Sequence, residues 1–341
     1  MKESAVDQFG LKTSVIIPVH KRKNFLRSAV TSVTSQVVDG VAEVVVVKDF
    51  SDSEVDSWLG RQGVIALTLY DERIGSKLSH ALDYCNGDII SILDDDDCFD
   101  RSKVRVTQKH FRAHPDLIFL SDSQRLIGED GRVPPNSAHV EPRRTKDYYL
   151  HENPREKLAI YSKELIGQGA CTSTISFRRP FIDPHRNSLE RLYIAADFFL
   201  LFVALSSHGS MLFLSDQLTD YRVHESYTHG SRHLSFEDFS ESSKRRLDRL
   251  KNDWDVIGET VKSTPAEQYA NRYRYDIALR SAMFSPPARL GIHGTKDLGF
   301  AGIEQDAVGL RSLLLHATVT VDPRIARLLA FAHYIIRYSD R

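Results

Sequence analysis

Short β-branched runs alternate with segments of helical periodicity over the first third of the chain. The apolar runs and candidate helices follow one another at 13–19 (TSVIIPV), 24–38, 43–47 (EVVVV), 53–59, 64–69, 77–85, 88–93 (DIISIL) and 101–112. Continuous β-branched runs are typical of strands covered on both faces. This order predicts an α/β fold with a mostly parallel sheet and flanking helices.

Composition excludes several classes of protein. In 341 residues, 45 Lys and Arg nearly balance 46 Asp and Glu, which gives a formal net charge of −1. No basic field is therefore available for binding nucleic acid. Three scattered cysteines are too few for a disulfide framework. Residues 1–12 are polar, and no apolar run has the length of a membrane span. We expect a cytoplasmic protein.

The remaining chain predicts two further parts. Residues 113–230 read as a less regular continuation of the α/β core, after a first half at 1–112. Residues 231–341 carry charged helical segments and form a C-terminal helical extension. Its last candidate helix, 323–338, has an apolar stripe and several arginines. Packing on its own domain is the favoured interpretation, ahead of a homodimer contact or a peripheral contact at the inner membrane face.

Four consecutive aspartates, Asp94, Asp95, Asp96 and Asp97, directly follow the buried run DIISIL. Adjacent carboxylates repel one another, and a hard divalent cation such as Mg²⁺ or Mn²⁺ compensates for that repulsion. The alternative is a solvated turn or a helix cap. Parallel sheets bind ligands beyond the carboxyl ends of their strands, so the position favours the metal.

Other polar side chains follow the neighbouring predicted strands. Pro18, His20 and Arg22 end the first strand, and Asp49 follows the second. Asp49 suits hydrogen bonds from a base or ribose, or a cap for the next helix. Lys77 offers a cation near a helix start, where diphosphates bind. The chain contains no GxGxxG after the first strand and no GxxxxGK[ST], which argues against a dinucleotide dehydrogenase and a P-loop protein.

Three segments together resemble the amino-terminal half of family 2 glycosyltransferases: TSVIIPVHKRKNFLRSAVTSVTSQ, EVVVVKDFSD and NGDIISILDDDDCFDRSKV. The resemblance covers about residues 12–109 and becomes patchy to about 228. It implies a GT-A-like, Rossmann-like fold with a DxD metal motif. It also implies a metal-dependent, inverting transfer of sugar from a nucleotide diphosphate sugar to an acceptor hydroxyl. The acceptor would be a glycan or a lipid-linked glycan.

By this resemblance, the DxD motif falls on Asp94, Asp95 and Asp96. Asp96 is then the direct metal ligand, with Asp94 or Asp95 near the ribose and diphosphate. The base-binding acid of the family falls on Asp49.

Two departures from the family pattern leave the nucleotide preference open. The family's DDG corresponds here to Lys48, Asp49 and Phe50. The family's arginine after the third strand matches Leu78, so Lys77 or Arg73 would substitute for it.

An inverting transfer also needs a base that removes the proton of the acceptor hydroxyl. Asp197 is the candidate, because it stands in the apolar stretch YIAADFF, where burial would raise its pKa. It matches the Asp of the family's Glu-Asp pair, with Ala196 in place of Glu. A helix cap or a buried ion pair is the alternative role.

The segment YRVHES resembles the family's YRxH sequence. Arg222 would then contact the diphosphate, and His224 the metal, although a lone histidine is more often structural. The glycine-containing segment 167–173 forms either the acceptor side of the cleft or a plain turn.

Two other functions remain open from the sequence. A sugar-phosphate nucleotidyltransferase would need a glycine-rich loop after the first strand, and residues 20–23 (HKRK) contain no glycine. A non-catalytic nucleotide- or glycan-binding protein of the same fold is compatible with the departures at Lys48, Phe50 and Ala196.

Overall fold

The computed structural model describes residues 10–36, 41–134, 144–166, 170–224, 235–284 and 325–331. The chain divides into two compact units, Met1–Val223 and His224–Arg341. The boundary expected at 112/113 falls inside the first unit, and one sheet extends across it.

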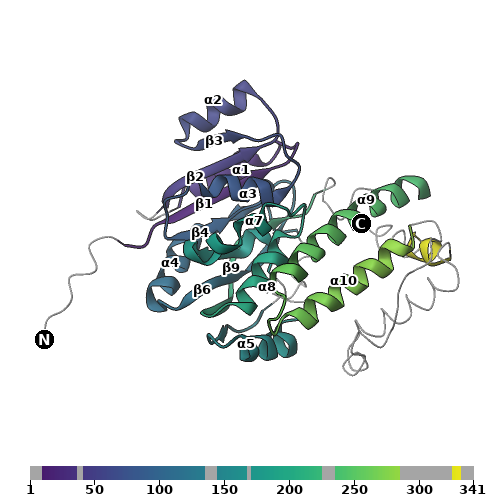
Figure 1. Ribbon diagram of the computed structural model, residues 1–341. Helices are drawn as coiled ribbons and strands as arrows, with labels where there is room; N and C mark the ends of the chain where they lie inside the picture. Colours follow the sequence, from purple (N-terminus) through teal and green to yellow (C-terminus); the bar gives the residue numbers. More distant parts are fainter. Residues whose placement is uncertain are drawn as a thin grey trace, which may run out of the picture. The chain divides into compact units, whose positions relative to one another are not determined.

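One mixed sheet contains nine strands of the described residues, in the order β3-β2-β1-β4-β8-β6-β9-β5, with β7 paired to β9 (Figure 1). The strands are β1 (Thr13–Val19), β2 (Val41–Lys48), β3 (Ile65–Thr68), β4 (Ile89–Ile92), β5 (Cys98–Phe99), β6 (Leu117–Ile127), β7 (Tyr148–Leu150), β8 (Ile175–Arg178) and β9 (Ser210–Arg222). The predicted mostly parallel sheet is confirmed for β1 to β4, whereas β8 runs antiparallel to both β4 and β6.

Helices connect these strands and flank the sheet (Figure 1). In the first unit they are α1 (Leu26–Thr34), α2 (Ser53–Arg61), α3 (Ile74–Leu82), α4 (Lys103–Ala113), α5 (Pro154–Ile160), α6 (Arg179–Ile182), α7 (Arg186–Leu189) and α8 (Ala196–Ser206). Short non-α helical turns cover Tyr161–Leu165, Thr172–Thr174 and Asp183–His185.

The strand order indicates the edge of the sheet at which a ligand is expected to bind. β1 pairs in parallel with β2 on one side and with β4 on the other. The chain therefore moves outward to β3 and then returns to the opposite side of β1 to form β4. Open α/β sheets bind ligands at such a reversal, beyond the carboxyl ends of the two strands.

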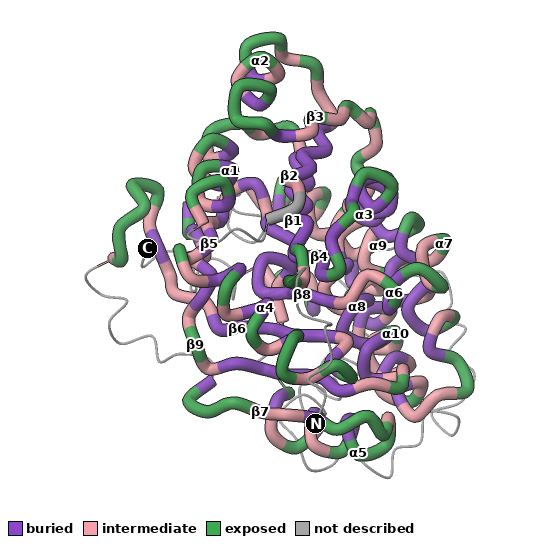
Figure 2. Tube along the Cα trace, turned by 90° about the vertical axis from the view of Figure 1, so that its left-hand side faces the viewer, coloured by how far each residue is buried: buried purple, intermediate pink, exposed green. Residues whose placement is uncertain are grey.

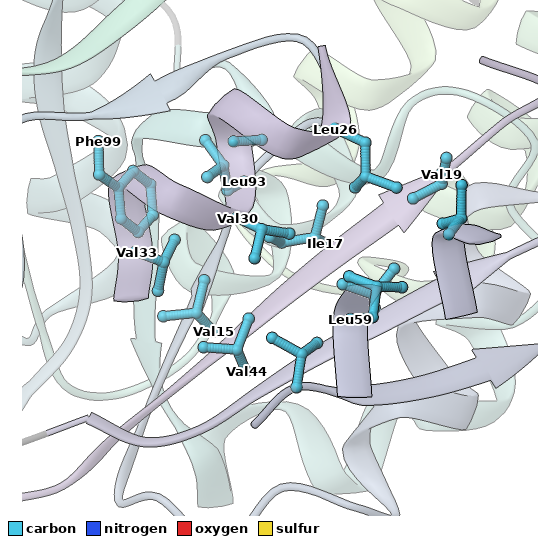
Figure 3. Packing of buried hydrophobic residues seen from close by; sticks show 14 residues of the cluster. Val15, Ile17, Val19, Leu26, Val30, Val33, Val44, Leu59, Leu93 and Phe99 are labelled. Carbon is cyan, nitrogen blue, oxygen red and sulfur yellow. The ribbon is translucent and has the colours of Figure 1, made fainter. Parts of the chain in front are cut away.

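The residues of the core beside β1 are those that the strand and helix repeats place on facing surfaces. Val15, Ile17 and Val19 alternate along β1 and therefore share one face, on which α1 packs with Leu26 and Val30 (Figure 3). β1 and β4 are buried along their whole length (Figure 2). This burial explains why neither strand alternates with polar residues in the sequence.

The second unit is built on the helices α9 (Phe236–Thr260) and α10 (Glu267–Ala282). Trp254 and Tyr273 stack with their ring centroids 4.4 Å apart. Residues 325–331 are helical, and Ala326 packs in a cluster with Phe239 and Met283. The rest of the helix predicted at 323–338 lies outside the described residues. Across the described ranges, no helix is both long and apolar enough to cross a membrane.

A buried lysine caps the apolar helix α8. The Lys157 ammonium donates to the carbonyl oxygens of Ala204 (2.7 Å), Ser207 (2.6 Å) and Gly209 (2.9 Å). These carbonyls belong to the last turn of α8 and the chain just beyond it, where a cation is favourable. Burial lowers the pKa of Lys157 from 10.5 to about 8.

Replacing this lysine should change both the stability and its pH dependence. Lys157→Met should lower the free energy of unfolding by about 1–3 kcal/mol at pH 7, because three carbonyls lose their donor. Between pH 8 and 10.5 the unfolded chain binds the lysine proton more tightly than the folded chain does. The wild-type advantage should therefore widen as the pH rises through that window.

Urea unfolding of both proteins at pH 7 and pH 10 measures this difference. Lys163→Met is the matched control, because the Lys163 side chain is 82% exposed. An advantage that narrows with increasing pH would contradict the assignment.

Candidate active site

The carboxyl ends of β1, β2 and β4 bring most of the predicted site residues together. His20 and Arg22 follow β1, Asp49 follows β2, and the four aspartates follow β4 by one residue. The parallel pairing of these strands places all three ends at one edge of the sheet.

Asp49 is the centre of a cluster at the β1–β2 edge. Its Oδ1 accepts from the Lys21 amide (2.9 Å), and its Oδ2 accepts from His20 Nδ1 (2.5 Å) and Lys77 Nζ (3.1 Å). Burial alone would raise the pKa of Asp49, but the donors from Lys21 and Lys77 lower it below its ordinary value. Asp49 is therefore ionised at neutral pH.

His20 covers this carboxylate and reaches the surface. Its side chain is 42% exposed, against 6% for Asp49. Burial lowers the pKa of His20, although Asp49 acts in the opposite direction. A neutral His20 donates through Nδ1, which leaves Nε2 as an acceptor.

The two family departures near Asp49 have structural explanations. Lys77 is buried and also donates to the carbonyl oxygen of Val19 (2.8 Å), so it ties α3 to the end of β1. Lys48 instead donates to Phe50 O (2.8 Å) and Thr68 Oγ1 (2.8 Å), which stabilises the edge between β2 and β3.

Pro18 lies just beyond the point where β1 and β4 separate. The β1–β4 pairing ends at Ile16↔Ile92, whereas β1 stays paired with β2 through Pro18↔Val47. A residue without an N–H costs no ladder hydrogen bond in this position. Pro18 is buried in the sheet, so its nucleotide contact stays a prediction.

Arg22 neutralises part of the acidic turn formed by Asp94 to Asp97. Its Nη2 lies 3.1 Å from Asp95 Oδ1 and 3.0 Å from Asp96 Oδ2. The amide of His20 adds a hydrogen bond to Asp95 Oδ2 at 3.3 Å. The end of β1 thus supplies the positive charge and a donor that face this turn.

The acidic turn nevertheless has less positive charge around it than its carboxylates need. Burial raises the pKa of Asp95 to about 7 despite Arg22, and it raises the pKa of Asp97 to about 7. Burial, with the neighbouring aspartates, raises the pKa of Asp94 well above its ordinary value. A further cation beside such a cluster would favour the ionised carboxylates and lower their pKa values.

The donor chemistry of Asp94, Asp95 and Asp96 fits a hard divalent cation. Within the described part of the chain, no three His, Cys, Asp or Glu side chains converge as a complete metal cage. Mg²⁺ is commonly held by one or two carboxylates together with substrate phosphates, and that arrangement needs no such cage.

Arg222 supports the acidic turn from within the protein. Its five N–H donors contact the carbonyl oxygens of Asp96 (2.7 Å), Gly128 (3.0 Å) and Glu129 (3.0 Å), the Ser28 hydroxyl (2.9 Å) and the Cys98 sulfur (3.5 Å). These contacts engage all five N–H groups of the guanidinium within the protein. The expected diphosphate contact of Arg222 stays a prediction.

Asp197 comes from a distant segment and lies near the acidic turn. It occupies the first turn of α8 and is half-buried. Its charge is close enough to contribute to the raised pKa of Asp94, after burial and the three neighbouring aspartates. His224 is buried and is the first residue of the second unit, and its role toward a metal stays a prediction.

Ser173 belongs to the site although it is not among the residues predicted from the sequence. Its hydroxyl donates to Asp97 Oδ2 (2.6 Å) and accepts from the amide of Asp94 (3.0 Å). A serine at the end of the segment 167–173 carries no local signal for this role, because its partners are 76 and 79 positions away. Residues 167–169 lie outside the described residues.

Helix α3 also approaches the segment that leads to Asp197. The amides of Ile74 and Gly75 donate to the carbonyl oxygens of Tyr193 (3.2 Å) and Leu192 (3.0 Å). A Cβ atom on Gly75 would lie 1.8 Å from the carbonyl oxygen of Leu189. This contact links the helix that carries Lys77 to the entry of α8. A polar cavity of about 460 Å³ beside α3 contains none of the predicted site residues.

Comparisons with known proteins agree with this fold. The family model described as glycosyl transferase family 2 matches residues 14–183. The structure of S. aureus TarS 1–349 with UDP-GlcNAc has a TM-score of 0.54 at 18% identity, over 93% of this chain and 81% of that chain. The TarS 1–349 complex with UDP has a TM-score of 0.53 at 17% identity, over 93% and 89%. No curated protein matches the chain.

The fold and the family match together define a glycosyltransferase with a GT-A-like sheet. The chain belongs, through residues 14–183, to glycosyl transferase family 2.

Gly75 gives a direct test of the contact between α3 and the segment before α8. Gly75→Ala should lower the free energy of unfolding by about 3 kcal/mol, because backbone atoms must move to admit the methyl group. Gly60→Ala is the control, since a Cβ there meets nothing within 4 Å in helix α2. That change should stabilise the protein by about 0.5–1 kcal/mol. Equal stability of the two variants in urea unfolding would refute the close approach.

Proposed function

We propose that this glycosyltransferase moves a sugar from a nucleotide diphosphate sugar to an acceptor hydroxyl, with inversion and with the help of Mg²⁺ or Mn²⁺. One observation carries the proposal: the buried acidic turn lies at the same edge of the parallel sheet as Asp49 and Arg22, and Arg22 Nη2 is 3.1 Å from Asp95 Oδ1 and 3.0 Å from Asp96 Oδ2. Carboxylates beside a guanidinium suit a divalent cation together with a diphosphate.

The acidic turn suits the departing diphosphate. A divalent cation bound there would act as a Lewis acid on the leaving group. Asp96 is the proposed direct ligand, with Asp94 and Asp95 beside the ribose and diphosphate. Arg22 is only one-third exposed and already faces these carboxylates, so its guanidinium can contact a diphosphate at the same place.

The β1–β2 edge suits the nucleoside. Asp49, His20 and Lys77 form a fixed polar cluster one strand away from the acidic turn. The two TarS structures contain UDP-GlcNAc and UDP. UDP-sugars are therefore the first donors to test.

Asp197 is proposed as the base that accepts the proton of the attacking hydroxyl. Inversion requires attack from the face opposite the leaving group, so the base must stand apart from the acidic turn. Asp197 lies on α8, whereas the acidic turn follows β4, and this separation supports the assignment.

The acceptor is proposed to be a glycan or a lipid-linked saccharide, and the enzyme to be cytoplasmic. Helix 325–331 packs through Ala326 on its own unit, which agrees with the favoured interpretation of the sequence. Leu328 and Leu329 of the same helix are 56% and 58% exposed. A peripheral membrane contact or a homodimer would use these side chains.

Donor binding can be tested by thermal shift with UDP, GDP and UDP-GlcNAc, each with and without Mn²⁺. A ligand that binds only the folded state raises the stability by RT ln(1 + [L]/Kd). We expect a Mn²⁺-dependent shift in the wild type and none in Asp96→Ala. The absence of any metal-dependent shift in the wild type would refute the donor site.

The base can be tested with Asp197→Asn. This variant should keep the Mn²⁺-dependent donor shift and lose transfer by at least about 100-fold, because the amide cannot accept the proton. Asp183→Asn, an exposed position on the same unit, is the control and should transfer normally. Full transfer by Asp197→Asn would remove Asp197 from the mechanism.

A further inference from the structure

The hydroxyl of Ser173 bridges the two ends of the acidic turn. It accepts from the Asp94 amide at 3.0 Å and donates to Asp97 Oδ2 at 2.6 Å. Ser173 is completely buried, and Asp97 is 1% exposed. The first and last aspartates of the turn are thus held by one side chain from another segment.

Asp97 is also held by the end of β9. Its Oδ1 accepts from the Arg222 amide at 2.9 Å, while Arg222 Nε donates to Asp96 O at 2.7 Å. Both carboxylate oxygens of Asp97 are thereby used inside the protein. Asp95 and Asp96, in contrast, face Arg22 at the end of β1. The four adjacent aspartates therefore have two different environments.

Ser173 itself is fixed by a buried ion pair. Its carbonyl oxygen accepts from Lys103 Nζ at 2.9 Å. Lys103 also donates to the Asp122 carboxylate and to Thr219 Oγ1 (3.0 Å), and all of these side chains are fully buried. Elements α4, β6 and β9 consequently determine where the Ser173 hydroxyl lies. A buried network with every member satisfied holds its geometry tightly.

We propose that Ser173 and Asp97 are positioning residues for the transfer reaction, and that Asp97 is not a ligand of the donor or its cation. They fix the backbone of the turn so that Asp94, Asp95 and Asp96 face the donor despite their mutual repulsion. This inference rests on the proposed function for its kinetic consequence. An error of about 1 Å in such a position can cost a hundredfold in rate.

Ser173→Ala and Ser176→Ala form a matched pair for the test. Ser176 lies three positions after Ser173 in the same segment and is also fully buried. Its side chain makes one hydrogen bond, at 2.7 Å to the Ser91 hydroxyl. It does not contact the turn. Both variants lose a buried hydroxyl, so both urea midpoints should fall, and the fall should be larger in Ser173→Ala because it loses two hydrogen bonds.

Amide hydrogen exchange of the ligand-free chain measures how stably the turn is held. The Asp97 amide donates to Asp94 O at 3.2 Å and does not contact Ser173. Its exchange should accelerate about tenfold or more in Ser173→Ala and stay unchanged in Ser176→Ala. Transfer assays should show kcat falling about 10- to 100-fold in Ser173→Ala alone, with a smaller change in the donor KM. Equal effects in both variants would overturn the proposal.

Asp97→Asn provides a second test if Ser173→Ala does not fold. Asparagine keeps an acceptor for the Arg222 amide and a group that can bond Ser173. The affinity for UDP in the presence of Mn²⁺ should then fall much less in Asp97→Asn than in Asp96→Asn. The loss in Asp96→Asn should be at least about tenfold larger. Equal losses in the two variants would make Asp97 a ligand and refute the inference.

If the wild type binds no nucleotide, the proposed function fails. The exchange comparison on the ligand-free chain still decides whether Ser173 positions the turn.

Discussion

Repulsion among four adjacent carboxylates at the end of β4 is the constraint around which the site is built. A turn of this composition would spread apart if its backbone were unsupported. Two kinds of contact stabilise the turn. Ser173 and Arg222 form buried hydrogen bonds with Asp97, and the Arg22 guanidinium forms an ion pair with Asp95. The hydrogen bonds fix the backbone, and the guanidinium leaves part of the charge uncompensated. That remaining charge is the physical basis of the proposed cation site.

The sequence predicted the first four strands and the helices between them closely, because both periodicities are strong there. TSVIIPV matches β1 residue for residue. The second half was harder to predict. The apolar residues at 117–120 and 125–127 read as two short strands, but the structure has one strand there, β6, because buried Ser121 and Asp122 interrupt the apolar pattern without interrupting the strand. A side chain that is polar and yet buried gives a misleading signal in any pattern of hydropathy.

The site shows the same limit. Residues at strand ends, such as Asp49, Arg22 and the acidic turn, could be located because topology places them together. The contacts that Arg222 makes within the protein could not be inferred, since a cation near a predicted diphosphate site suggests an anion partner. Its actual partners are mainly backbone carbonyls, which no sequence pattern reveals. Ser173 was missed for the same reason: its partners are distant in the chain, and one of them is a backbone amide.

The approach of α3 to the chain before α8 has a consequence for the evolution of such an enzyme. At Gly75 the two segments meet backbone to backbone, with no side chain between them. The distance between α3 and the segment that leads to Asp197 is thus set by main-chain atoms. A partly exposed side chain such as His20 can be exchanged without altering that distance, whereas Lys77 cannot, because it also ties α3 to the end of β1. In the proposed enzyme, exposed side chains beside Asp49 could therefore change the donor preference while the distance to the proposed base stays constant.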